Sequence, residues 1–147
     1  MKTVVYTSQI IDNDPGALLA TIVQRSRVNN NAAGITGALI HQGRQIIQVI
    51  EGEDTATDQL YNKICNDPRH TNITTIYRQP ISRRSFAHWS LQGLTVTVEA
   101  SFSVETIQLV SDLFDTRFVF RSDLYLNMLE AVFTRPEFMQ RVARKAA

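Results

Sequence analysis

The sequence predicts an α+β fold in which one domain spans residues 1–98 and a short helical tail spans residues 99–147. Several segments alternate between polar and apolar residues, as β-strands do, and two segments between them have the spacing of amphipathic helices. From Ser103 onward the apolar residues recur only at helical spacing. A chain of 147 residues, 44% of them hydrophobic, is long enough to bury one core without disulfides.

The first strand and the first helix are predicted at the N-terminus. Residues 3–8 alternate between two faces, which indicates a strand. Asp14 can cap a helix that has Pro15 at its first position. We expect this helix to end in the asparagine run 29–31, because asparagine tolerates left-handed backbone. Its inward stripe consists of Leu19, Ile22, Val23, Ser26 and Asn30.

A β-hairpin and a second helix come next in the chain. Residues 34–41 and 44–51 have the pattern of strands, and Gln-Gly at 42–43 favours a tight turn between them. Asp54 is expected to cap the second helix. That helix should end at residues 67–70, where a proline interrupts the helical pattern.

Two further strands are predicted over residues 73–79 and 86–98, so the order of elements is β-α-β-β-α-β-β. This order favours a ferredoxin-like sheet with two helices on one face, followed by short C-terminal helices. The tail has more large apolar side chains than two short helices need for packing: Phe118, Phe120, Phe133, Phe138 and Met139. They either cover the open face of the sheet or form a surface for homo-oligomerisation or partner docking.

The composition and the motif content exclude several classes of function. A formal net charge of +1 predicts no nucleic-acid partner. Cys65 is the only cysteine and the sequence has no Cys/His cluster, so we expect neither a disulfide nor a metal site. No apolar run has the length of a signal peptide or a membrane span, which predicts a soluble, cytoplasmic protein. Without a catalytic triad, a carboxylate pair or a nucleotide-binding loop, we expect no enzymatic activity.

Three polar residues interrupt the hydrophobic pattern of the predicted core: Tyr6, Asn30 and Gln48. An interior amide without partners would cost about 1 to 3 kcal/mol, so Gln48 requires hydrogen-bonding groups nearby. The residues alone leave two interpretations. They are a packed tyrosine, a helix cap and a satisfied core amide, or they line a slot for a planar heteroaromatic ring with carbonyls on one edge.

These residues lie within longer strings, SRVNNNAAGITGALI, IIQVIEGE, ICNDPRH and RRSFAHWSLQ. In order and spacing the strings resemble the landmarks of the BLUF family, the blue-light sensors that use FAD, over about residues 2–94. The resemblance implies a photoreceptor that binds FAD non-covalently, with FMN as the alternative cofactor. The short tail is similar to that of stand-alone members, which signal through a partner protein.

The resemblance also implies roles for single positions. Tyr6 matches the photoactive tyrosine, and Gln48 matches the glutamine between that phenol and the flavin. Trp89 matches a tryptophan associated with signal transmission, and Leu91 stands where the family usually has methionine. Leucine has a similar volume but lacks the thioether contact. The other implied cofactor-binding residues are Ser8, Ile22, Ser26, Asn29, Asn30, Leu39, Ile46, Lys63, Ile64, Asp67, Arg69 and His70.

The mechanism implied by the resemblance is a light-driven rearrangement of the Tyr6–Gln48–flavin hydrogen bonds, relayed through the last strand to the tail helices. Two other classes of function stay open at this point. A flavin-dependent oxidoreductase would need a substrate-binding group, and a flavin-free interaction module would use the apolar tail for its partner.

Overall fold

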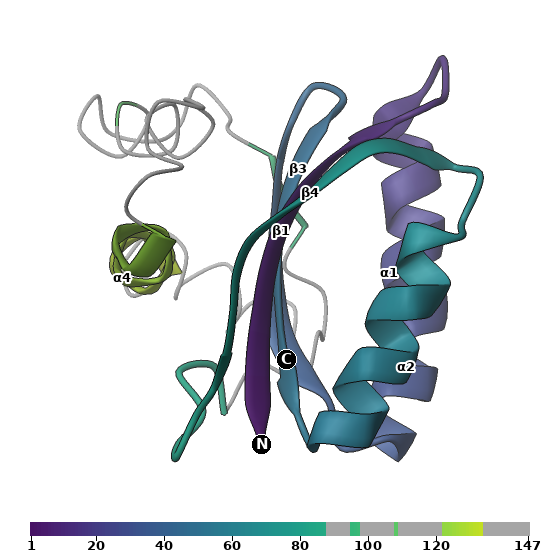
Figure 1. The fold of residues 1–147 in the computed structure, drawn as a ribbon. Coiled ribbons are helices and arrows are strands. Elements are labelled where there is room, and N and C mark those ends of the chain that lie inside the picture. Colours follow the sequence, from purple (N-terminus) through teal and green to yellow (C-terminus); the bar gives the residue numbers. More distant parts are fainter. Residues whose placement is uncertain (88–94, 98–107, 109–121, 134–147) are drawn as a thin grey trace, which may run out of the picture.

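The computed structural model describes residues 1–87, 95–97, 108 and 122–133 (Figure 1). The helices and strands in these residues are β1 (Lys2–Ile10), α1 (Pro15–Ala32), β2 (Thr36–Gln42), β3 (Gln45–Gly52), α2 (Asp54–Cys65), β4 (His70–Pro80), β5 (Thr95–Thr97) and α4 (Ser122–Phe133). None of the described helices is long and apolar enough to cross a membrane.

The strands form one five-stranded sheet in the order β4-β1-β3-β2-β5. β1 lies between β3 and β4 and is antiparallel to both, β2 and β3 form the hairpin, and β5 is parallel to β2. This arrangement confirms the predicted ferredoxin-like α+β fold. Because β1 lies between two strands, its side chains on the helical face are surrounded by both neighbouring strands and by the helices that cover this face.

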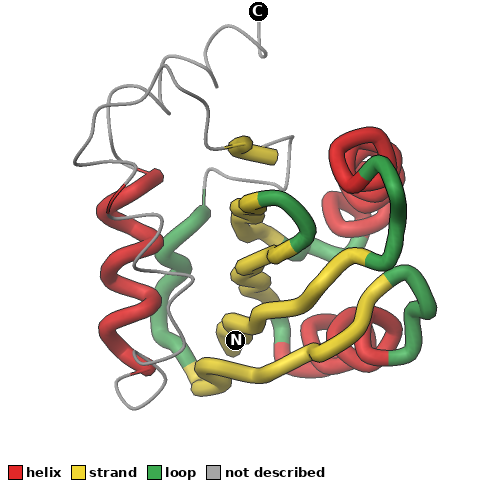
Figure 2. Tube along the Cα trace, turned by 90° about the horizontal axis from the view of Figure 1, so that it is seen from above, coloured by secondary structure: helices red, strands yellow, loops and turns green. Residues whose placement is uncertain are grey.

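The helices lie on both faces of the sheet. α1 and α2 cover one face, and α4 lies against the other face (Figures 1 and 2). Leu129 and Val132 of α4 are buried, whereas Asn127 and Ala131 are exposed. Both alternatives for the tail, covering the open face of the sheet and homo-oligomerisation, stay predictions.

β1, β2 and β3 are buried on both faces, and alternation along the strands assigns each residue to one of the faces. On the side of α1 and α2, a core cluster contains Val4, Tyr6, Ile35, Ile50 and Tyr61. A second cluster on the same side contains Ile10, Leu19, Leu39 and Ile46. The odd-numbered residues of β3, among them Glu51, therefore project towards α4.

Local signals at the start of α1 act as predicted. Asp14 is the N-cap, its carboxylate accepts a hydrogen bond from the backbone N–H of Ala17 at 3.1 Å, and Pro15 is the first helical residue. The prediction for Asp54 is wrong. Glu53 is the N-cap of α2, and Asp54 lies in the first turn, where its carboxylate forms an ion pair with the N-terminal amine of Met1 at 3.2 Å.

The prediction that the last strand begins at Phe86 is also wrong. Phe86 lies in a bend, and its backbone N–H donates to the carboxylate of Glu51 at 3.0 Å. In a strand this N–H would be available for pairing with a neighbouring strand. Here it is hydrogen-bonded to the side chain of Glu51 instead. The described strand begins at Thr95, while Trp89 and Leu91 lie outside the described residues.

Candidate functional site

A pocket lies between the two helices α1 and α2 and the sheet, and it encloses about 720 Å³ of space, part of it open to solvent. A concave site with a mostly apolar lining and a few polar groups is typical of small-molecule binding. Its lining combines apolar side chains with two carboxamides and several charged groups. The lining residues are Tyr6, Leu19, Ile22, Val23, Ser26, Asn30, Leu39, Gln48, Leu60, Lys63, Ile64, Asp67, Arg69 and His70.

Tyr6 and Gln48 meet at the sheet floor of the pocket. They are direct partners in the antiparallel register of β1 and β3, so their side chains project from the same face. The hydroxyl of Tyr6 donates a hydrogen bond to Oε1 of Gln48. On the other side of Tyr6, the pairing of β1 with β4 shifts between Val5 and Tyr6. Such bulges locally change the direction of a side chain next to functional sites.

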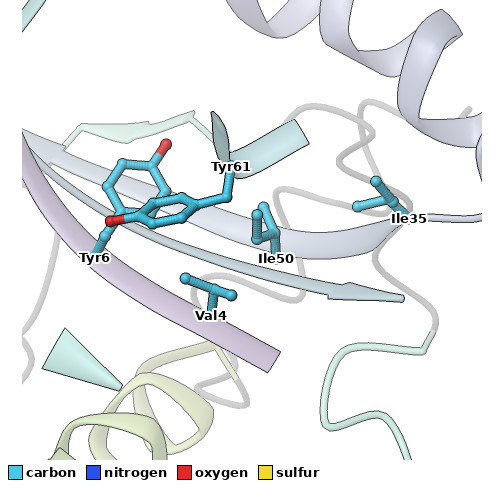
Figure 3. Packing of buried hydrophobic residues seen from close by; sticks show 5 residues of the cluster. All are labelled: Val4, Tyr6, Ile35, Ile50 and Tyr61. Carbon is cyan, nitrogen blue, oxygen red and sulfur yellow. The ribbon is translucent and has the colours of Figure 1, made fainter. Parts of the chain in front are cut away.

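The environment of Tyr6 keeps its phenol protonated. Its ring is fully buried beside the ring of Tyr61, with centroids 5.3 Å apart and planes tilted by 51° (Figure 3). Burial raises the pKa of Tyr6 well above its ordinary value, and the nearby Tyr61 adds to this rise. The Tyr61 hydroxyl is hydrogen-bonded to Oγ1 of Thr75 at 2.6 Å, so α2 and β4 together fix the packing partner of Tyr6.

Gln48 and Asn30 provide the hydrogen-bonding groups of the pocket. Gln48 is 8% exposed and Asn30 is 3% exposed. Among the described residues, neither the amino group of Gln48 nor the side-chain amide of Asn30 has a hydrogen-bond partner, although both side chains line the pocket. Asn30 is fixed in place by its backbone, because its carbonyl accepts from the N–H of Ile35 at 2.8 Å. Buried amides require partners, so a ligand with donors and acceptors on one edge fits this pocket.

The charged groups gather where α2 ends and β4 begins. Arg69 forms an ion pair with Asp67 at 2.5 Å, and Lys63 lies in the last turn of α2. Hydrogen bonds from Arg69 lower the pKa of Asp67, which is therefore a carboxylate at neutral pH. Nδ1 of His70 lies 3.2 Å from Oγ of Ser8, and burial lowers the pKa of His70. His70 is thus neutral at physiological pH and can act as a donor or an acceptor.

Most of the residues implied by the resemblance come together around this pocket, and three others of that set do not line it. Asn29 is exposed, because neighbouring residues on a helix point about 100° apart and Asn30 is the inward one. The hydroxyl of Ser8 contacts His70, and Ser8 itself is not among the lining residues. Ile46 is fully buried in the cluster with Ile10 and Leu39.

Three apolar lining residues, Leu19, Val23 and Leu60, were not assigned to the cofactor from the sequence. Leu19 and Val23 belong to the inward stripe of the first helix, so helical spacing was the signal that could have identified them. No group of His, Cys, Asp and Glu residues suited to a metal ion occurs in the described ranges.

Comparison with known proteins identifies the family. The family model for sensors of blue light using FAD, called BLUF, matches residues 1–92. The chain is 32% identical over 103 residues to the photoactivated adenylate cyclase subunit beta of Euglena gracilis, which covers 69% of this chain and 12% of that protein. It is 32% identical over 76 residues to the blue light- and temperature-regulated antirepressor BluF of Escherichia coli K12, covering 52% of this chain and 19% of that protein. The chain thus spans only a small part of the curated relatives it matches.

Comparison with solved structures also identifies BLUF proteins. The dark-state structure of BlrB, a BLUF protein, superimposes with a TM-score of 0.70 at 32% identity, over 90% of this chain and 93% of that one. Klebsiella pneumoniae BlrP1 with FMN and cyclic diGMP superimposes with a TM-score of 0.61 at 26% identity, over 85% of this chain and 34% of that one. With the pocket between α1, α2 and the sheet, these matches show that the chain belongs to the BLUF family, the sensors of blue light that use FAD.

Proposed function

We propose that this protein is a blue-light photoreceptor that binds FAD non-covalently and signals through a rearrangement of the hydrogen bonds of Gln48. The observation that carries the proposal is the hydrogen bond from the Tyr6 hydroxyl to Oε1 of Gln48 at the floor of the pocket. A phenol bonded to a carboxamide that also lines the pocket has the parts of a proton-coupled switch.

The residues of the pocket divide into two functional groups. The carboxamides of Asn30 and Gln48 would bond the polar edge of the flavin ring, while Ile22, Leu39 and Ile64 would pack on its faces. Ser26 on α1 would line the same slot.

Lys63 and Arg69, with His70 beside them, would hold the ribityl and phosphate part at the charged end of the pocket. FAD is proposed over FMN on the basis of the family. The FMN in the BlrP1 structure shows that a related protein can hold the smaller flavin. Release of the flavin by denaturation and chromatography against both standards distinguishes the two.

When bound, the flavin would supply the absorption of blue light and an excited state able to accept an electron, and Tyr6 would be the group that loses this electron and later regains it. Tyr6 passes its hydroxyl proton to Gln48 in the same event and takes it back, so no net oxidation remains. Gln48 is left rotated or tautomerised. In its new pose the amino group of Gln48 would donate to the ring, and such a hydrogen bond would lower the excitation energy and shift the absorption to the red.

The rearrangement spreads because Gln48 is buried. An amide group without a partner there would cost about 1 to 3 kcal/mol, so the neighbours of Gln48 adjust to its new pose. We propose that residues 1–98 form the flavin domain and that residues 99–147 read the change. Trp89, with Leu91 two residues later, would lie on the path between them.

The output is proposed to be a protein partner or a second copy of this chain in the cytoplasm, without enzymatic activity of its own. The cyclase relatives are many times longer than the matched segment, and the antirepressor relative is named as a regulator. The relatives therefore support a sensing role for the part they share with this chain.

A difference spectrum of the purified protein before and after blue light tests the proposal. We expect a yellow protein whose flavin bands shift slightly to the red in the light and return in the dark, since a hydrogen bond is a small perturbation of the ring. A protein that stays colourless after addition of FAD would favour the interaction module. Light-independent consumption of NAD(P)H by a flavin-loaded protein would favour the oxidoreductase.

A further inference from the structure

A carboxylate is buried on the face of the sheet opposite the pocket. Glu51 is 0% exposed and follows Gln48 by three positions on β3. Because side chains alternate along a strand, Gln48 projects towards the pocket and Glu51 projects towards α4. The register places Glu51 opposite Thr3 of β1 and Thr36 of β2. Glu51 is therefore on the strand that carries the switch, but outside the cofactor site.

Glu51 holds the segment that follows β4. Its Oε1 accepts the backbone N–H of Ser85 at 3.2 Å, and its Oε2 accepts the backbone N–H of Phe86 at 3.0 Å. In the opposite direction, the guanidinium of Arg84 donates to the backbone carbonyl of Glu51 at 3.2 Å and to Oγ1 of Thr36 at 2.9 Å. Four hydrogen bonds thus join residues 84–86 to β2 and β3.

The carboxylate of Glu51 has a specific role here, because burying it is costly in free energy. A buried carboxylate is unfavourable unless hydrogen bonds compensate it, and an apolar side chain of similar size would fill the same space at lower cost. An apolar side chain could not accept two consecutive backbone N–H groups. Phe86, which is 1% exposed, inserts into the core at the point that the carboxylate defines. The carboxylate therefore sets the position of residues 84–86 as well as filling the core.

The charged groups that affect Glu51 include one on α4, the helix on this face of the sheet. Burial raises the pKa of Glu51, the N–H groups of Phe86 and Ser85 and the Arg84 cation lower it, and the carboxylate of Glu130 on α4 raises it. Glu130 is half-buried, so solvent partly screens its interaction with Glu51. The hydrogen bonds to residues 84–86 are therefore the contacts through which a movement of Glu51 acts.

We propose that Glu51 is a positioning residue that transmits a movement of β3 at Gln48 to residues 84–86, three residues before Trp89. The inference rests on the proposed photoreceptor function. Hydrogen bonds weaken steeply with distance and angle, so a small displacement of β3 changes both bonds of the carboxylate together. The segment towards the tail is then released or tightened while the flavin pocket itself stays intact.

Hydrogen exchange of the full chain in the dark and under blue light tests this inference. In the wild type we expect light to change the exchange of the peptide that covers residues 84–86. Glu51→Gln keeps the size of the side chain but places an amino group against one of the two N–H donors. We expect it to retain the red shift, to exchange roughly tenfold faster at residues 84–86 in the dark, and to lose the difference between light and dark.

Matched variants separate positioning from general stability. Thr3→Val changes a buried residue on the same face, opposite Glu51 in register, and should keep the light-dark difference. Arg84→Gln removes the hydrogen bonds from Arg84 to Thr36 and to the carbonyl of Glu51 without burying a new group. It provides the test if Glu51→Gln fails to fold. It should reduce the light-dark difference, whereas Arg83→Gln, at the exposed neighbouring arginine, should not.

Two outcomes overturn the inference and leave the photoreceptor function standing. One is a wild type that shows the red shift without any light-dependent exchange at residues 84–86. The other is a Glu51→Gln or Arg84→Gln protein that keeps the full light-dark difference. A wild type without a red shift overturns the photoreceptor function itself, and the role of Glu51 in transmission with it.

Discussion

Tyr6 and Gln48 stand opposite each other on adjacent antiparallel strands, and the hydroxyl of Tyr6 donates a hydrogen bond to Oε1 of Gln48. Both side chains are buried, and both line the same pocket. The amino group of Gln48 has no partner in the part of the chain that the structure describes, so one end of the amide is fixed by the protein and the other is available to a ligand. The first two predictions test this arrangement.

Replacement of Tyr6 by phenylalanine should leave FAD bound and abolish the light-induced red shift. The ring still packs beside Tyr61, but the hydroxyl that bonds Gln48 is gone. The absorption difference between dark and illuminated protein measures the effect. Tyr61→Phe is the matched control, because it removes a neighbouring hydroxyl that bonds Thr75 instead of Gln48, and it should keep the shift. A normal shift in Tyr6→Phe would exclude Tyr6 as the photoactive residue.

Gln48→Leu should also bind flavin without a normal photocycle. Leucine fills a similar space on β3 but cannot exchange one hydrogen-bonded pose for another. The measurement is again the light-minus-dark spectrum. Gln45→Leu changes an exposed glutamine on the same strand and should behave like the wild type. If Gln48→Leu and Gln45→Leu gave the same red shift, Gln48 could not be the switch.

Asn30→Ala should weaken flavin binding by roughly tenfold or more, because an unpaired polar edge of a buried ligand costs about 1 to 3 kcal/mol. Asn29→Ala tests the adjacent position, which is exposed on the outer side of α1, and should leave the affinity unchanged. Flavin fluorescence titration of the two variants measures both values. Equal losses would mean that the buried carboxamide does not contact the ring.

His70 should make the protein less stable in mildly acidic solution. Burial lowers the pKa of His70 below its ordinary value of about 6.5, so the unfolded chain binds more protons than the native one as the pH falls below that value. The stability contributed by neutral His70 is complete above about pH 6.5 and is lost as the pH falls towards the native pKa.

Urea unfolding at about pH 7.5 and about pH 5 should therefore show a larger loss of stability for the wild type than for His70→Gln. Burial also lowers the pKa of His41, but His41 is present in both proteins and its effect cancels in the comparison. Equal pH sensitivity of the two proteins would contradict the assignment.

Short-range signals in the sequence predicted much of the fold and of the site. The Asp14–Pro15 pair marked the start of α1, and the turn expected at Gln42–Gly43 lies one residue later, at Gly43–Arg44, between the paired residues Gln42 and Gln45. Helical spacing placed Ile22, Ser26 and Asn30 on one stripe, and all three line the pocket. Such signals involve residues that are close together in the chain, so they can be recognised in the sequence itself.

Long-range contacts were decided by the tertiary structure. Nothing near Phe86 in the sequence indicates that its N–H bonds a carboxylate 35 positions earlier, and this contact keeps Phe86 out of the last strand. The sequence likewise could not show that the hydroxyl of Ser8 contacts His70 or that Asn29 points outward. Periodicity determines which face a residue occupies along its own element, but only the packing of one element on another determines which groups meet, because those contacts join positions far apart in the chain.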